Sequence, residues 1–246
     1  MIRVFPIKLA EPDMNNDTRR EFLRTSAAMG VSLAAGASAT AAEPQPSTSH
    51  QAYGYQHTPA PLPFDAKNLK GLSEKLIQSH WENNYGGAVR ALNTLRGRLS
   101  AAAVDANMPP FVYTGMKREQ LLRTGSVVLH ELYFAGLGGN GQAGNAMRSR
   151  IAASFGSYDA WEVEFRKIAM GLAGGSGWVM LGYNEALGVL ENHWMADHAT
   201  APAHTRPWLV LDMYEHAFHM DYGAAAARYI DAWFANLNWE TVAARR

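Results

Sequence analysis

The sequence predicts an α+β fold, in which an N-terminal helical hairpin precedes a C-terminal lobe with a small three-stranded antiparallel sheet and helices. Two observations predict it. Apolar residues recur every three or four positions through long stretches of the first part, and three short apolar runs separated by turn residues follow. A chain of 246 residues can bury a sizeable core, either as one domain or as two lobes that share it.

The hairpin domain is predicted for residues 62–140 and the C-terminal domain, of mixed α and β structure, for residues 141–246. Periodic apolar residues at 66–100 and 117–135 predict its two helices, and a pair of prolines interrupts the pattern between them. The glycine-rich segment 136–144 is expected to be a loop, and the domain boundary is placed there.

The sheet is expected to form from the three short apolar runs. These runs are residues 177–181, 186–190 and 208–211, and Asn184-Glu185 between the first two suggests a hairpin turn. Helical stretches are predicted on either side of the sheet, at 145–174 before it and at 214–221 and 224–236 after it.

The composition excludes several classes of function. Twenty-two basic residues balance twenty-two acidic ones, so no overall charge favours nucleic acid or an anionic membrane as a partner. Cysteine is absent, which excludes disulfides, thiolate metal ligands and a cysteine nucleophile.

The N-terminus has the order of features of an export signal. Arg19-Arg20 begins a twin-arginine motif, a Gly/Ala-rich apolar run follows, and Ala39-Thr40-Ala41 suits signal peptidase. We therefore interpret residues 1–42 as a twin-arginine signal peptide and expect a periplasmic protein. The run is too short to be a stable membrane anchor. Residues 43–61, rich in Pro, Ser, Thr and Gln, are predicted to be a linker that packs poorly against the domain.

Four residues could form a metal site. His80 and His130 lie in two separate amphipathic helices, where a lone histidine is more often an ordinary core residue. Asp212 follows a buried strand pattern, and His216 comes one helical turn later, so these two can converge on one point. Three imidazoles and a carboxylate suit iron, manganese or zinc better than calcium or magnesium. By itself, the D-x-x-x-H spacing is a weak indication of a metal.

The segment Asp212-Met213-Tyr214-Glu215-His216-Ala217-Phe218 resembles the signature D-x-W-E-H-A-Y of the iron/manganese superoxide dismutases. Further segments resemble that family in the same order, from Leu62 to the C-terminus: Leu62-Pro63-Phe64-Asp65, Ser79-His80, Leu129-His130-Glu131-Leu132-Tyr133-Phe134, Phe155-Gly156-Ser157-Tyr158, Gly175-Ser176-Gly177-Trp178 and Tyr229-Ile230-Asp231-Ala232-Trp233.

This resemblance implies a superoxide dismutase with one iron or manganese ion per chain, bound by His80, His130, Asp212, His216 and a solvent molecule. The substrate would be superoxide, which is converted to oxygen and hydrogen peroxide. The choice between iron and manganese stays open.

The resemblance also implies roles for residues around the ion. The family places a Gln or His beside the bound solvent, and we expect His193 to take this catalytic role because Ser126, at the alternative position, is too short. Trp178 and Tyr214 are expected beside the metal site. Glu215 is expected to bond a ligand histidine of a second subunit and so to form a homodimer.

The chain departs from the family at its substrate gate, the motif H-x-x-x-H-x-x-x-Y on the first helix. Those positions hold Asn84 and Ala88, which cannot act as the imidazole and the phenol of the usual relay. Tyr85 is expected to point about 100° away around the helix. Two alternatives to a dismutase therefore stay open: a dismutase-like metal-binding protein with weak or no activity, and a metal oxidoreductase with another substrate.

Overall fold

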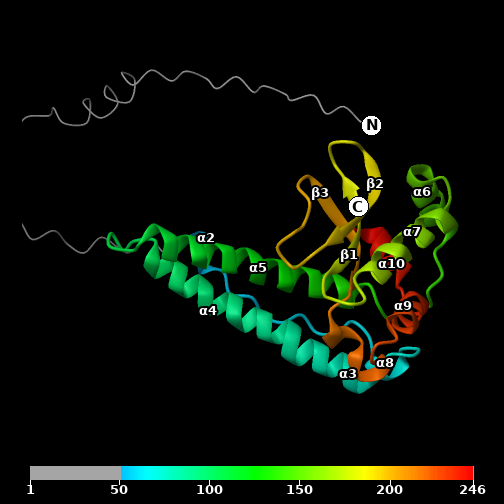
Figure 1. Ribbon diagram of the computed structural model, residues 1–246, viewed down its shortest axis with the longest axis horizontal. Coiled ribbons are helices and arrows are strands. Elements are labelled where there is room, and N and C mark those ends of the chain that lie inside the picture. The colour runs from blue at the N-terminus through cyan, green and yellow to red at the C-terminus, as the bar shows by residue number, and fades with distance from the viewer. Residues whose placement is uncertain (1–50, 246) are drawn as a thin grey trace, which may run out of the picture. The chain divides into compact units, whose positions relative to one another are not determined.

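The computed structural model describes residues 51–245, which lie within one compact unit that spans residues 48–246. The predicted α+β class is confirmed: helices form the N-terminal part, and a three-stranded antiparallel sheet with further helices forms the rest (Figure 1). No helix in this described part combines the length and the apolar character needed to cross a membrane.

The hairpin consists of two long helical arms that lie side by side (Figure 1). Ser73 starts the first arm, because its hydroxyl oxygen accepts from the backbone N–H of Leu76 at 3.1 Å. The second arm begins at Pro110, earlier than the predicted residue 117, since proline lacks the N–H that a first turn leaves unpaired. The first arm comprises α3 (Glu74–Ser79), the π-helix η2 (His80–Tyr85) and α4 (Gly86–Ala102), and the second is α5 (Pro110–Ala135).

The sheet has the strand order β2-β1-β3, with β1 (Trp178–Asn184), β2 (Val189–Met195) and β3 (Thr205–Asp212). Trp178 pairs with Met195 on one side and with Asp212 on the other, so the start of β1 and the ends of β2 and β3 lie at one edge. Five consecutive residues of β3, from Trp208 to Asp212, are buried, as expected for a strand covered on both faces.

The predicted position of the second strand is wrong. The side chain of Asn184 accepts from the backbone N–H groups of Ala186 and Leu187, and Gly188 adopts a positive φ of 72°. Residues 186–188 therefore belong to the turn, and β2 starts at Val189 and continues to Met195. This shift places His193 inside a strand.

The helices α6, α7, α9 and α10 of the C-terminal part lie on one side of the sheet (Figure 1). The stretch predicted as helical at 145–174 is two helices, because Gly156 ends the first of them with a φ of 82°.

The predicted boundary at residue 140 falls in the loop after α5, and one hydrophobic core continues across it. The remaining elements are α2 (Gln51–Gly54), α6 (Asn145–Phe155), α7 (Tyr158–Gly171), α9 (Ala226–Ala235), α10 (Trp239–Ala244), the short α8 (His219–Tyr222) and the 3₁₀ turns η1 (Ala66–Asn68) and η3 (Glu215–Ala217).

Residues 51–61 are bound to the hairpin, so the prediction of a poorly packed linker is wrong for this part. Asn93 accepts from the backbone N–H of His57 and donates to its carbonyl oxygen, both at 2.9 Å. The backbone N–H of Ala60 donates to the hydroxyl of Tyr85, and the indole of Trp81 donates to the carbonyl of Ala60. Side chains of the first arm thus bond backbone N–H and C=O groups of this segment, as a neighbouring strand would. The rest of the predicted linker and the predicted signal peptide lie outside the described residues.

Asn93→Ala should release this segment. Loss of the two hydrogen bonds is expected to lower the free energy of unfolding by about 1–2 kcal/mol and to expose Tyr53 and Tyr55 to chymotrypsin. Thermal unfolding and limited proteolysis measure the two effects. The matched control is Asn83→Ala on the same arm, whose side chain bonds its near neighbour Ser79. Equal resistance of both variants to chymotrypsin would show that Asn93 does not hold the segment.

Candidate metal centre

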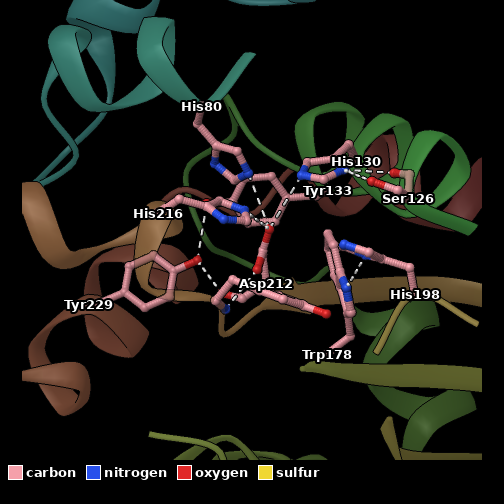
Figure 2. A network of polar contacts seen from close by, with 10 residues as sticks. His80, Ser126, His130, Tyr133, Trp178, His198, Asp212, His216 and Tyr229 are labelled. Atoms are coloured by element: carbon pink, nitrogen blue, oxygen red, sulfur yellow. Dashed lines mark hydrogen bonds and ion pairs between the residues drawn. The ribbon is translucent and has the colours of Figure 1, made fainter. Parts of the chain in front are cut away.

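Both parts of the fold contribute to one cluster of potential ligands. His80 starts the π-helix, His130 lies on α5, Asp212 ends β3, and His216 lies in η3 (Figure 2). Their four ligand atoms all lie within 4.8 Å of one another. Two ligands on opposite sides of one ion, each at about 2.1 Å, would be about 4.2 Å apart. The cluster therefore has the size of a mononuclear site, and it contains the four predicted residues.

Asp212 is the centre of this cluster. Its Oδ2 atom lies 3.1 Å from the Nε2 atoms of both His80 and His216 and 3.6 Å from Nε2 of His130. Its Oδ1 atom accepts from the backbone N–H of Tyr214 at 2.8 Å. Burial would raise the pKa of this fully buried carboxyl, but His216 and His80 outweigh it and hold the pKa well below its ordinary value. Asp212 is thus a carboxylate.

The backbone of α5 sets the protonation of His130. Its Nδ1 atom lies 2.7 Å from the carbonyl oxygen of Ser126, and a carbonyl can only accept, so Nδ1 carries the proton. Burial, followed by the nearby His80, lowers the pKa of His130 to about 3, and the ring is therefore neutral. Its Nε2 atom is buried without a hydrogen-bond partner and presents a lone pair to the cluster. This is the state that a metal ligand requires.

The donor atoms fit iron or manganese. Three imidazoles and one carboxylate provide three nitrogen donors and one oxygen donor, which suits these ions. A buried imidazole nitrogen without a partner is costly unless a ligand occupies it. The residues present therefore fit the metal ion that the resemblance implies.

A pair of buried tyrosines holds the end of β3. The hydroxyl of Tyr229, on α9, donates to the carbonyl oxygen of Asp212 at 2.7 Å and lies 3.1 Å from the hydroxyl of Tyr133, on α5. Because Tyr229 uses its proton on Asp212, it accepts from Tyr133. Sequence reasoning assigned no role to these residues, since they lie 96 positions apart and no short motif links them.

Trp178 and Tyr214 lie where they were expected, beside the ligands. The ring of Trp178 is perpendicular to that of His130, with 5.2 Å between the centroids, and Tyr214 stacks on His216 at 5.3 Å. Glu215 is exposed next to His216. Its predicted contact with a second subunit stays a prediction.

The predicted position of His193 beside the site is wrong. It pairs with Met180 within the sheet, and its Nε2 atom lies 3.8 Å from a carboxylate oxygen of Glu191. The histidine that reaches the ligands is His198, just beyond β2 (Figure 2). Because β2 continues to Met195, a histidine that follows the strand lies closer to the ligands than one within it.

His198 is held by aromatic neighbours. Its Nδ1 atom accepts from the indole Nε1–H of Trp178 at 2.9 Å. Its ring stacks on Tyr214 with 4.8 Å between centroids and lies 5.8 Å from the ring of His130. The pairing of Met195 with Trp178 brings the end of β2, and so the residues that follow it, to the level of the site.

At the gate, the direction of the Tyr85 ring differs from the expectation. Ala88 is buried and Asn84 is half-buried. Tyr85 does not point away, because a π-helix bonds residue i to residue i+5 and brings this ring toward the face of His80. The ring lies 6.3 Å from that of His130, but its hydroxyl donates to Glu131 at 2.8 Å.

Comparison with known proteins agrees with this geometry. Residues 143–245 match the family described as iron/manganese superoxide dismutases, C-terminal domain. The chain is 48% identical over 185 residues to an iron superoxide dismutase of Cupriavidus metallidurans, covering 75% of this chain and 93% of the relative.

More distant relatives include enzymes named for either metal. An iron superoxide dismutase of Aquifex pyrophilus is 34% identical over 72% of this chain and 84% of its own length. A manganese superoxide dismutase of Haloferax volcanii is 30% identical over 75% of this chain and 92% of its own. With the four ligands in place and most of its described length aligned to such relatives, the chain belongs to the iron/manganese superoxide dismutase family.

Proposed function

We propose that this protein is a superoxide dismutase, which converts two superoxide ions and two protons to dioxygen and hydrogen peroxide at one iron or manganese ion. The convergence of His80, His130, Asp212 and His216 is the observation that carries the proposal. The bound ion supplies the one-electron oxidation and reduction. Likeness to relatives named as iron and manganese superoxide dismutases supports the same reaction here.

The charges of the site suit an anionic substrate. Asp212 supplies one negative charge, and His80 and His130 are neutral because burial lowers the pKa of each. A divalent or trivalent ion therefore keeps a net positive charge, which attracts superoxide. Among the four side chains, that of His216 is 25% exposed and the others are at most 1% exposed. We infer that the substrate approaches from the side of His216.

His198 takes the role that was predicted for His193. Burial lowers the pKa of His198, so its ring is neutral, and its Nδ1 atom accepts from Trp178. The proton is therefore on Nε2, the atom free to donate toward the site. A donor at this place can orient a reacting group and supply a proton when superoxide is reduced.

Substitution of a ligand tests the function. The purified protein, loaded with iron or with manganese, should bind one ion per chain and consume superoxide. Asp212→Ala should lose the metal and lower the rate to that of the uncatalysed reaction, because its oxygen is the charged ligand. Asp105→Ala, which removes an exposed carboxylate, is the control. If the metal-loaded protein leaves superoxide unchanged, the chain is a dismutase-like metal-binding protein, and a screen of other reducible substrates would follow.

The two histidines can be separated by a matched pair of variants. His198→Ala should retain the metal, shift its midpoint potential and lower turnover by on the order of 10²-fold, as expected for loss of a positioned proton donor. His193→Ala should retain both metal and turnover. Metal analysis, potentiometry and stopped-flow superoxide decay provide the readouts. A large loss of turnover in His193→Ala alone would return the role to His193.

We infer that two chains form a homodimer through Glu215. Its support is the exposed position of this carboxylate next to the ligand His216. Glu215→Ala should shift the protein toward monomers in size-exclusion chromatography with light scattering, because a charge-assisted bond across the interface is lost. Glu240→Ala, which also removes an exposed carboxylate, is the control. A stable dimer in the Glu215 variant would contradict this role.

Export to the periplasm is proposed from the sequence. Its support is the order of the Arg19-Arg20 pair, the apolar run and the Ala39-Thr40-Ala41 site. The protein isolated from the periplasm should begin near residue 42, and N-terminal sequencing would show this. An intact N-terminus on the mature protein would reject the proposal.

A further inference from the structure

Two glycines lie within the helix α5, at positions 115 and 125. Glycine is the least favourable helix residue except proline, so each position raises the question of what its missing side chain permits. An ideal Cβ placed on Gly115 meets no atom within 4 Å. On Gly125 it would lie 1.7 Å from the carbonyl oxygen of His198 and 2.8 Å from the carbonyl carbon. Of these two glycines, only Gly125 has the space of its missing side chain occupied by another part of the chain.

The contact joins the loop that carries His198 to the turn of α5 that precedes His130. The next residue, Ser126, accepts from Nδ1 of His130 through its carbonyl oxygen. One short segment of α5 therefore orients a metal ligand with one residue and supports the backbone of His198 with the other. The ring of His198 then meets the indole of Trp178 at 2.9 Å.

A side chain at this position would move His198. Real Cβ contacts do not fall below 3.0 Å, so a methyl group would push the carbonyl of His198 away by at least 1.3 Å, the difference between 3.0 and 1.7 Å. The helix is the stiffer partner, because α5 is anchored by buried residues directly after Gly125, namely Ser126 and Val127, whereas the segment after β2 is only partly buried. If the ring of His198 follows its backbone by this distance away from Trp178, the 2.9 Å bond lengthens beyond hydrogen-bond range.

We propose that Gly125 is a positioning residue for the reaction: it sets the distance between His198 and the metal ligands by letting the carbonyl of His198 lie against α5. The effect of Gly125 on turnover rests on the proposed role of His198. The effect of Gly125 on the position of His198 is independent of that role, and it can be measured without metal.

Gly125→Ala is compared with Gly115→Ala, the same change on the same helix. In metal-free protein labelled with ¹⁵N-tryptophan, the indole N–H signal of Trp178, assigned with Trp178→Phe, reports the bond to His198. Gly125→Ala should shift this signal and speed its exchange with water, because the acceptor has moved. Gly115→Ala should leave it unchanged. An unshifted signal in Gly125→Ala overturns the proposal, whatever the activity of the protein.

Turnover per bound metal provides the second readout. Gly125→Ala should keep its metal and lose turnover on the order of 10²-fold, like His198→Ala. In a His198→Ala background, Gly125→Ala should lower the melting temperature, since the clash with the backbone persists, but should lower turnover no further. An equal loss of turnover in both backgrounds would mean general damage to the site and would overturn the proposal.

A second variant covers the case in which Gly125→Ala does not fold. Asp197 shapes the same loop, because its carboxylate accepts from the backbone N–H of Ala199 at 2.7 Å. Asp197→Ala loosens the loop without adding atoms to α5, and it should shift the Trp178 signal and lower turnover. Unchanged values of both would show that the position of this loop does not govern the reaction. If the unsubstituted protein consumes no superoxide, the proposed function fails, while the indole signal still decides the role of Gly125.

Discussion

The carboxylate of Asp212 lies fully buried at the end of β3, where its charge has no access to water. A buried charge that lacks partners costs several kcal/mol, so the surrounding residues must compensate for it. Three imidazoles approach its Oδ2 atom, the N–H of Tyr214 bonds Oδ1, and Tyr229 bonds its carbonyl. These groups come from both the hairpin and the C-terminal part, which is why packing of the two parts and assembly of the site are one event.

Two histidines of the site show how the hydrogen-bond partner decides the role of a ring. His130 donates from Nδ1 to a carbonyl oxygen, so its Nε2 atom holds a lone pair and can bind metal. His198 accepts at Nδ1 from an indole, so its Nε2 atom holds a proton and can donate. Both rings are kept neutral by burial, which lowers their pKa values. The two neighbouring rings, with 5.8 Å between their centroids, thus hold opposite tautomers, one with an acceptor and one with a donor at Nε2.

The first arm of the hairpin differs from the family pattern near the gate, and in this region it forms a π-helix. The π-helix brings Tyr85 toward the ligands, but the hydroxyl of this residue is used by Ala60 and Glu131. Residues 51–61 are held by the same arm through Asn93 and Trp81. Tyr85 therefore supports the packing of the ligand helix and does not replace the missing phenol of the gate.

The sequence alone determined the α+β class and the order of the elements, because periodic apolar residues are local patterns. It identified the four ligands through the resemblance of several segments, in order, to the iron/manganese superoxide dismutases. It did not determine which histidine lies beside the four ligands. Residues 186–188 form a turn, so the second strand begins later than predicted and contains His193. The attachment of residues 51–61 and the bond of Tyr229 to Asp212 were also decided by tertiary structure. Each of these depends on contacts between residues far apart in the chain, where a single hydrogen bond leaves no pattern in the sequence.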